Sequence, residues 1–263
     1  MNMWRIGQMA LACAVLPVTS LAAEPLTLQG IMQDIGRNVQ AIVGGLSRED
    51  DAPLEKAVPA NQLIQKPALQ AGENWTYRRV DLWRNTEIER FRQDMLGGVG
   101  DHLTVLWTIA SSANDRRRGS VTREYLDGAT LSFFDPKADG RHVPLLFPLY
   151  PGKRWSFRYR YPTASGTGSL KIEQAAVVEG WEEVRVPAGT FRALKVVHTG
   201  RYWASEQMYS WSGAIHETYW YAPVAKRVVR MEYRDTTGSG AQWDRWRDEL
   251  VDLTTVSKSL QRK

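Results

Sequence analysis

From residue 73 onward, polar and apolar side chains alternate along much of the chain. The clearest example is residues 154–161, in which Arg and Ser alternate with aromatic residues. Residues 103–109, 170–178 and 229–233 show the same alternation. Successive side chains of an extended strand point to opposite faces of a sheet, so a period of two predicts strands with one buried face. We therefore expect a mainly β protein.

Short turn signals separate these segments. Asp127-Gly128 and Glu179-Gly180 are typical of tight hairpins, Pro187-Ala188-Gly189 of a slightly longer one, and Ala222-Pro223 of a strand end. The segments follow one another too closely for crossover helices, so the strands should pair antiparallel. A sheet of about ten strands must curl, split or close. The expected architecture is a large curved antiparallel sheet, as a barrel, half-barrel or sandwich.

The first 23 residues have the features of a secretory signal peptide. Arg5 gives a positive start, an apolar run extends from Met9 to Val18, and small residues precede Glu24. The run is too short to span a membrane. A lipoprotein beginning at Cys13 is the alternative, but the residues after Cys13 stay apolar, so we expect ordinary cleavage and a periplasmic protein. The mature chain would then contain no Cys.

Residues 24–72 are predicted to be a helical segment and linker. Apolar residues recur at helical spacing over residues 26–46, which predicts an amphipathic helix. This segment resembles the opening helix pair of cytochrome c prime-like proteins, but it lacks the Cys-x-x-Cys-His motif, so no haem is implied. The β domain should cover residues 73–256, and residues 257–263 should form a tail.

Three stretches of the β region resemble a known group of exported domains. They are Phe147–Trp155, Glu183–Phe191 with the following Ala193–Val196, and Glu217–Pro223 leading into residues 228–230. Their order is similar to uncharacterised exported bacterial β domains grouped as TapB-like. The family has Gly near position 225, where this chain has Ala225. The resemblance covers about residues 145–235 and implies an envelope-facing β domain without a defined reaction.

No motif for catalysis, cofactor binding or metal binding stands out. The four histidines, at positions 102, 142, 198 and 216, are far apart, and His216-Glu217 lies in a predicted strand without a second His at helical spacing. There is no Gly-x-Ser-x-Gly motif. Glu182 and Glu183 are adjacent on a strand and should point to opposite faces. The net charge of +5 is spread along the chain, unlike that of a nucleic-acid reader.

The candidate binding residues come from an aromatic segment, residues 201–213, and from a basic strand face. They are Tyr202, Trp203, Tyr209, Trp211, Arg158 and Arg160. Aromatic side chains with polar tips suit stacking on sugars, covering an apolar ligand or anchoring a protein. The simpler interpretation is that the tryptophans cap the end of a barrel and that the arginines form a solvated face.

The sequence thus predicts a non-catalytic periplasmic envelope protein that binds an apolar or glycan ligand on a concave aromatic surface. One alternative is an interaction module that docks a protein partner through the helix of residues 26–46. Another is a hydrolase whose catalytic residues are dispersed along the chain. An envelope lipid, a glycan or a protein is the expected partner, and no nucleic acid, membrane span, cofactor or metal is expected.

Overall fold

The computed structural model describes residues 58–100, 102–112, 120–125, 139–163 and 166–255. The predicted signal peptide with Cys13, the helix of residues 26–46, the turn at Asp127-Gly128 and the tail of residues 257–263 lie outside these ranges. The described part contains eleven strands and two short 3-10 helices, which confirms the prediction of a mainly β chain. Within these residues, no helix has the length and apolar character needed to cross a membrane.

The strands form one sheet in which every neighbouring pair is antiparallel. Its order is β4-β3-β2-β1-β11-β10-β9-β8-β7-β6-β5. The elements are η2 (Ala60–Gln62), β1 (Asn74–Asp81), β2 (Thr86–Val99), β3 (His102–Ser112), β4 (Ser120–Tyr125), β5 (Asp139–Gly140), β6 (Arg154–Pro162), β7 (Ser169–Val186), β8 (Gly189–Ser205), β9 (Ser210–Ala222), η3 (Pro223–Ala225), β10 (Arg227–Thr236) and β11 (Gln242–Thr254).

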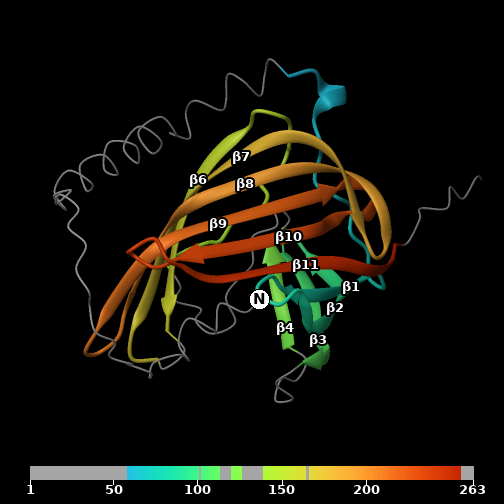
Figure 1. Cartoon of the computed structure of the whole chain (residues 1–263). Helices are drawn as coiled ribbons and strands as arrows, with labels where there is room; N and C mark the ends of the chain where they lie inside the picture. The colour runs from blue at the N-terminus through green and yellow to red at the C-terminus, as the bar shows by residue number, and fades with distance from the viewer. Residues whose placement is uncertain (1–57, 101, 113–119, 126–138, 164–165, 256–263) are drawn as a thin grey trace, which may run out of the picture.

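The pairing of β1 with β11 joins the first and last strands in the middle of the sheet. β4 and β5 are its two edges, so the described strands form an open curved sheet and not a closed barrel. Figure 1 shows β7 to β11 as long arcs, with β1 to β4 turned away to one side. The expectation of a large curved antiparallel sheet is confirmed, and the closed form among the expected alternatives is wrong for these strands.

β7 corrects one predicted turn. The strand runs without a break from Ser169 to Val186, through the Glu179-Gly180 pair that was expected to form a hairpin. Its register against β8 shifts between Val178 and Gly180, and Gly180 has a φ of 155°. An extra residue in one strand makes such a β-bulge, and glycine tolerates the backbone conformation. The hairpin lies at Pro187-Ala188, where the Pro187-Ala188-Gly189 signal predicts it, but the turn has two residues because Gly189 already pairs with Val186.

The buried side of the sheet, called the inner face below, carries three hydrophobic clusters. The first packs the inner residues of β1, β2 and β3 against the far ends of β7 and β8, which are not their neighbours in the sheet. Trp75 is completely buried in this cluster and donates from Nε1 to the Ala225 carbonyl at 2.8 Å. Because this cluster joins strands that are distant in the sheet, the sheet must curl around the inner face.

Residues 141–150, called the strap below, lie across the inner face of β6 to β9. Leu145, Phe147 and Leu149 belong to the second cluster, together with inner residues of these four strands. The indole of Trp155 donates to the Val143 carbonyl at 3.1 Å, and Leu149 forms a two-way backbone bridge with Ile64. The strap therefore covers part of the inner surface, where the sequence analysis expected a concave aromatic surface for a ligand.

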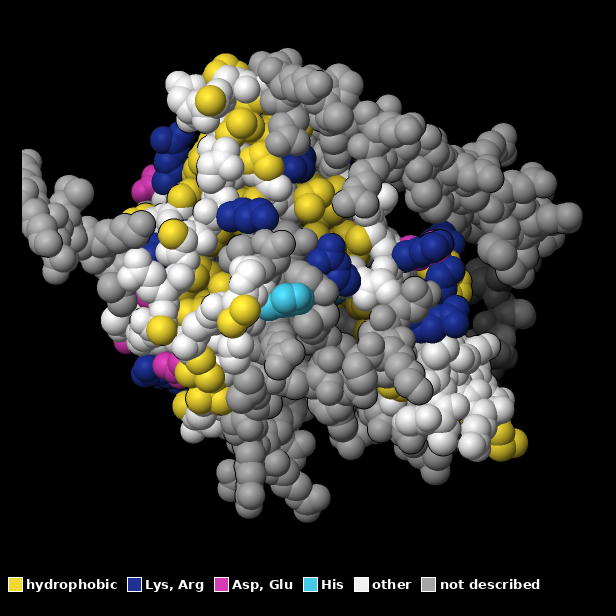
Figure 2. Space-filling view, turned by 180° about the vertical axis from the view of Figure 1, so that it is seen from behind, with side chains coloured by type: hydrophobic (Ala, Val, Ile, Leu, Met, Phe, Trp, Pro, Cys, Tyr) yellow, Lys and Arg dark blue, Asp and Glu magenta, His cyan; other side chains and the backbone are white. Residues whose placement is uncertain are grey.

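The opposite side of the sheet, called the outer face, carries the polar half of the alternation. β6 shows this most clearly, because Trp155 and Tyr159 are buried whereas Arg154, Arg158 and Arg160 are exposed. On the side of the molecule seen in Figure 2, Lys and Arg side chains lie at several separate places among hydrophobic surface. The positive charge is thus not gathered into one block there.

Gly213 on β9 allows Tyr202 to pack on the inner face. It pairs directly with Tyr202, and a Cβ at this position would overlap the Thr236 carbonyl oxygen and lie 2.7 Å from Tyr202 Oη. Gly213→Ala should therefore lower the free energy of unfolding by about 1–3 kcal/mol through overpacking. Urea denaturation measures this change. Ala214→Ser, on the exposed side of the same strand, is the control, and equal stability of the two variants would contradict the packing described.

Candidate functional site

The strap and three adjacent strands bring four polar side chains together inside the protein. They are His142 of the strap, Gln174 of β7, His198 of β8 and Glu217 of β9, and we call them the polar cluster. His198 and Glu217 face each other directly in the β8–β9 ladder, and Gln174 lies two residues along β7 from the partner of His198. All three strand residues point inward because they fall in phase with the buried alternation of their strands.

The Oε2 atom of Glu217 is the centre of the polar cluster. Gln174 donates to it from Nε2 at 2.9 Å, and His142 Nε2 lies 3.4 Å away. His198 Nδ1 is 3.7 Å from the same oxygen. The ligand atoms of His142, His198 and Glu217 all lie within 4.8 Å of one another, and all three residues are nearly or fully inaccessible to solvent.

The protonation of His198 follows from its other nitrogen. His198 Nε2 lies 3.0 Å from the Pro144 carbonyl oxygen, which can only accept a hydrogen bond, so Nε2 carries the proton. Burial lowers the pKa of His198 to about 3, against the opposing effect of Glu217, and the ring is therefore neutral at physiological pH. Nδ1 is consequently a bare acceptor, and it has no hydrogen-bond partner.

Glu217 is ionised in spite of its burial. Burial alone would raise the pKa of this carboxyl, but His142 and His198, with the hydrogen bond from Gln174, lower it to about 2. A buried carboxylate is stable only when donors or cations surround it. The carbonyl oxygen Oε1 of Gln174 is a further buried acceptor without a partner. Two buried acceptors of the polar cluster, His198 Nδ1 and Gln174 Oε1, therefore have no hydrogen-bond partner.

Aromatic rings enclose the two histidines. The His198 ring lies 4.9 Å from that of Tyr219, 5.4 Å from Phe157 and 5.7 Å from Trp155, measured between centroids. The Tyr219 hydroxyl lies 3.4 Å from His142 Nε2. Burial also raises the pKa of Tyr219 well above its usual value, with Glu217 adding to the shift, so the hydroxyl stays protonated. This shell excludes water and strengthens the electrostatic interactions inside it.

Neither His142 nor His198 makes a hydrogen bond to a serine within the described residues. Their polar contacts are Glu217, Tyr219 and the Pro144 carbonyl. The arrangement can hold a cation or a proton between nitrogen and carboxylate atoms, but it does not assemble a serine nucleophile with a histidine base.

The structure divides the six predicted binding residues between the two faces of the sheet. Tyr202 is buried on the inner face, where its hydroxyl donates to the Thr236 carbonyl at 3.0 Å, so it acts as a structural residue. Trp211 is half-buried on the same face and stacks at 5.4 Å on Tyr209, which is 56% exposed in the β8–β9 loop. The remaining three, Trp203, Arg158 and Arg160, lie on the outer face.

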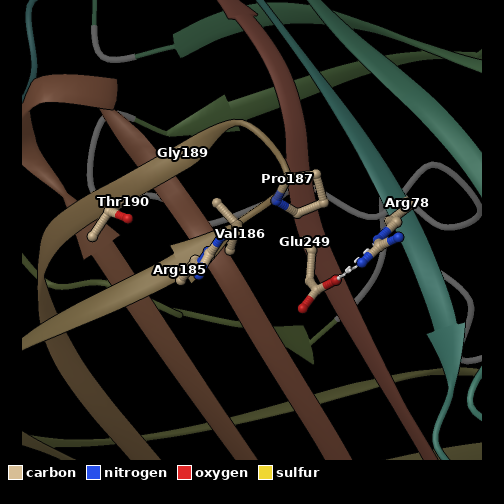
Figure 3. Close-up of a pocket in the computed structure, with 7 residues that line it drawn as sticks. All are labelled: Arg78, Arg185, Val186, Pro187, Gly189, Thr190 and Glu249. Atoms are coloured by element: carbon tan, nitrogen blue, oxygen red, sulfur yellow. Dashed lines mark hydrogen bonds and ion pairs between the residues drawn. The ribbon is translucent and has the colours of Figure 1, made fainter.

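A pocket of about 520 Å³ lies at a different place, between the β7–β8 turn and β11. Figure 3 shows Arg78 of β1 and Glu249 of β11 pointing toward each other at one side of it. Their ion pair measures 2.7 Å. This pocket contains none of the predicted aromatic residues.

The sequence analysis missed the polar cluster because its members are spread over 75 positions without a recognisable spacing and lie on four different segments. It did consider Glu217, but beside His216, which points to the outer face. One signal was available. Polar Gln174, His198 and Glu217 each occupy a position that the alternation of their strand assigns to the buried face, and a buried polar residue usually has a specific partner.

Comparisons with known proteins identify no family. No family model and no curated protein matches the chain. The resemblances to TapB-like domains and to cytochrome c prime-like proteins therefore stay predictions.

Three solved structures resemble the chain. One is an exported protein with a YmcC-like fold from Bacteroides fragilis, at 17% identity and a TM-score of 0.47, covering 73% of this chain and all of the other. A lipoprotein from Parabacteroides distasonis has 12% identity and a TM-score of 0.47, covering 73% of this chain and 99% of the other. The lipoprotein YmcC from Escherichia coli has 10% identity and a TM-score of 0.35, covering 72% of this chain and 87% of the other. None of these descriptions names a ligand or a reaction, and nothing of the three is carried over to this chain.

The buried, neutral His198 makes stability depend on pH. The unfolded chain binds a proton at this residue below pH 6.5, whereas the folded chain does not bind it until about pH 3. Stability should therefore fall as the pH drops below 6.5, by about 1.4 kcal/mol per pH unit at most. In chelator-containing buffer, the stability advantage of the native chain over His198→Gln should shrink by about 2 kcal/mol between pH 7 and pH 5.

Urea denaturation at several pH values measures this difference. Burial raises the pKa of Asp235 to about 6, which acts in the opposite direction, but the effect is common to both proteins and cancels. His102→Gln, at an exposed position of β3, is the matched control and should follow the native profile. A His198→Gln profile parallel to the native one would show that His198 is charged in the folded protein.

Proposed function

We propose that this chain is a non-catalytic binding protein of the bacterial envelope and that it binds an anionic glycan on the outer face of β6 to β8. The observation that supports the proposal is a group of exposed cations beside an exposed indole. This group, called the outer patch, consists of Arg158, Arg160, Lys171, Arg201 and Trp203. It contains the three predicted binding residues that are accessible on one face.

The outer patch is arranged by the register of the strands. Arg160, Lys171 and Trp203 are paired in one row across β6, β7 and β8. Arg160 and Trp203 are therefore two strand spacings apart, roughly 10 Å. Arg158 and Arg201 flank Glu173 in the next row of the same face. Four cations therefore surround one carboxylate, and that carboxylate pairs with Lys171 at 2.7 Å.

Trp203 gives the outer patch an apolar surface. Its side chain is 40% exposed, and the Lys171 ammonium lies 5.2 Å from the centre of its ring. An aromatic ring held by a cation has a flat face on which a sugar ring can stack, and the neighbouring guanidinium groups suit bidentate contacts to carboxylate, sulfate or phosphate groups. Repeating anionic sugars would meet both features at once.

The inner face is less suited than the outer patch to binding a glycan or an apolar ligand. The rings of Tyr159, Tyr202 and Tyr219 are all buried against neighbouring side chains, and the strap lies over the middle of the face. A ligand there would have to displace this packing. The proposal therefore keeps the predicted residues Arg158, Arg160 and Trp203 and moves the binding surface to the outer face.

Binding to the outer patch can be tested with an immobilised sulfated glycan such as heparin, with neutral dextran as the comparison. The native chain should bind heparin more strongly than dextran, and binding should weaken with added salt. Arg158→Ala/Arg160→Ala and Trp203→Ala should each weaken binding about tenfold or more, because each removes contacts worth about 1.4 kcal/mol.

Matched substitutions outside the outer patch serve as controls. Arg234→Ala removes an exposed arginine of β10, and Trp243→Ala removes a tryptophan of β11 that is 45% exposed. Both should keep the native affinity. Equal losses of heparin affinity in the control and patch variants would mean that heparin binding depends only on the net charge of the protein. Binding of dextran as strongly as heparin would contradict the proposal that the glycan is anionic.

Export is also part of the proposal, and the mature N-terminus tests it. Cleavage before residue 23 or 24 should give an unmodified chain in the periplasmic fraction, whereas a lipoprotein would begin at a diacylated Cys13 and remain with the membrane. Intact-mass measurement separates the two. Both forms stay open until this measurement is made. Loss of membrane association in Cys13→Ser would establish the lipoprotein.

A further inference from the structure

We propose that His142, His198 and Glu217 bind a divalent transition-metal cation, with Zn²⁺ as the ion that their donor atoms fit best. This site is on the inner face and shares no residue with the outer patch, so the inference goes beyond the proposed glycan binding and does not depend on it. The inference is carried by three observations, which are the spacing of the ligand atoms, the tautomer of His198 and the two buried acceptors without a hydrogen-bond partner.

The spacing of the ligand atoms fits one metal ion. Two ligands bonded at about 2.0–2.1 Å to a tetrahedral zinc ion are roughly 3.3 Å apart. His142 Nε2 and His198 Nδ1 lie 3.4 Å and 3.7 Å from Glu217 Oε2, and all three atoms are within 4.8 Å of one another. Small side-chain rotations are sufficient to place the three donors around a common point.

The orientation of His198 is the one that metal-binding histidines adopt. Its Nε2–H donates to the Pro144 carbonyl at 3.0 Å, which fixes the ring and leaves the lone pair of Nδ1 directed toward Glu217. Metal-ligating histidines almost always donate their second nitrogen to a carbonyl or carboxylate in this way. Nδ1 is completely buried and has no hydrogen-bond partner.

The acceptors without a partner in the polar cluster need a donor or a cation. A lone pair of His198 faces an oxygen of Glu217, and two acceptors at that distance repel unless a donor or a cation lies between them. Gln174 uses its amide group to hold the same carboxylate, and its own Oε1 has no donor. A metal ion between the two histidines and Glu217 would satisfy the nitrogen lone pair and the carboxylate together.

The donor set selects the kind of metal. Two imidazole nitrogens and one carboxylate oxygen suit Zn²⁺ and related transition metals, whereas Mg²⁺ and Ca²⁺ prefer oxygen ligands alone. Binding would replace the hydrogen bond between His142 and Glu217 by bonds to the ion. Because His142 belongs to the strap and the other two ligands to β8 and β9, the metal would also fasten the strap to the sheet.

Isothermal titration of the full-length exported chain, stripped with a chelator and then titrated with ZnCl₂, tests the proposal. One Zn²⁺ per chain should bind, and MgCl₂ should give no binding. Glu217→Gln, His142→Gln and His198→Gln should each weaken Zn²⁺ binding at least tenfold. His102→Gln, which removes an exposed histidine of β3, should leave the affinity unchanged and controls for adventitious surface binding.

A second measurement uses only the native chain, so its result does not depend on whether the variants fold. X-ray absorption at the zinc edge should show two imidazole ligands and additional oxygen ligands around the bound ion. No zinc binding by the native chain, native affinity in folded Glu217→Gln, or an absorption spectrum without two imidazoles would each overturn the proposal. A polar cluster that only hydrogen-bonds the strap to the sheet would give the first of these results.

Discussion

The carboxylate of Glu217 is the constraint around which the interior of this protein is organised. It lies inside the sheet, where an ionised group is tolerated only if donors or cations surround it. Gln174 comes from β7, His198 from the adjacent strand β8 and His142 from the strap. The strap therefore has an electrostatic reason to lie where it does, in addition to the hydrophobic contacts of Leu145, Phe147 and Leu149.

The alternation of side chains places the two proposed sites on opposite faces of the sheet. In β8, His198 and Tyr202 point inward, whereas Trp203 points outward beside Lys171. A substitution in the outer patch can thus change surface recognition without touching the polar cluster, and the reverse also holds. This separation makes the two proposals independent, since each can fail without affecting the other.

Sequence reasoning predicted the fold better than the site. Strands such as β6 are visible in the sequence because alternation is a local property, and the turn at Pro187-Ala188 is likewise encoded by local backbone preferences. The bulge at Gly180 was misread as a turn because glycine serves both purposes, and only pairing with β8 distinguishes them. The pairing of β1 with β11, which leaves the sheet open at β4 and β5, depends on contacts between distant segments.

The site was hidden for the same reason. His142 and Glu217 are 75 positions apart, and nothing in either local sequence links them. The aromatic segment, residues 201–213, covers the end of β8, the loop after it and the start of β9. The assignment of each ring to a face needed the register of β8 against β9, which puts Tyr202 opposite Gly213 and Trp203 opposite Ser212. Polar residues at inward positions were the available clue to the polar cluster.

Anomalous diffraction at the zinc edge, from crystals of the chain grown without a chelator and with equimolar Zn²⁺, tests the central claim most directly. An ionised Glu217 facing a bare nitrogen of His198 needs a donor or a cation between them, and the proposed zinc site predicts one strong anomalous peak bonded to Glu217, His198 and His142. A map without a peak at this position, with a water molecule or a direct hydrogen bond joining His198 to Glu217, would contradict the account.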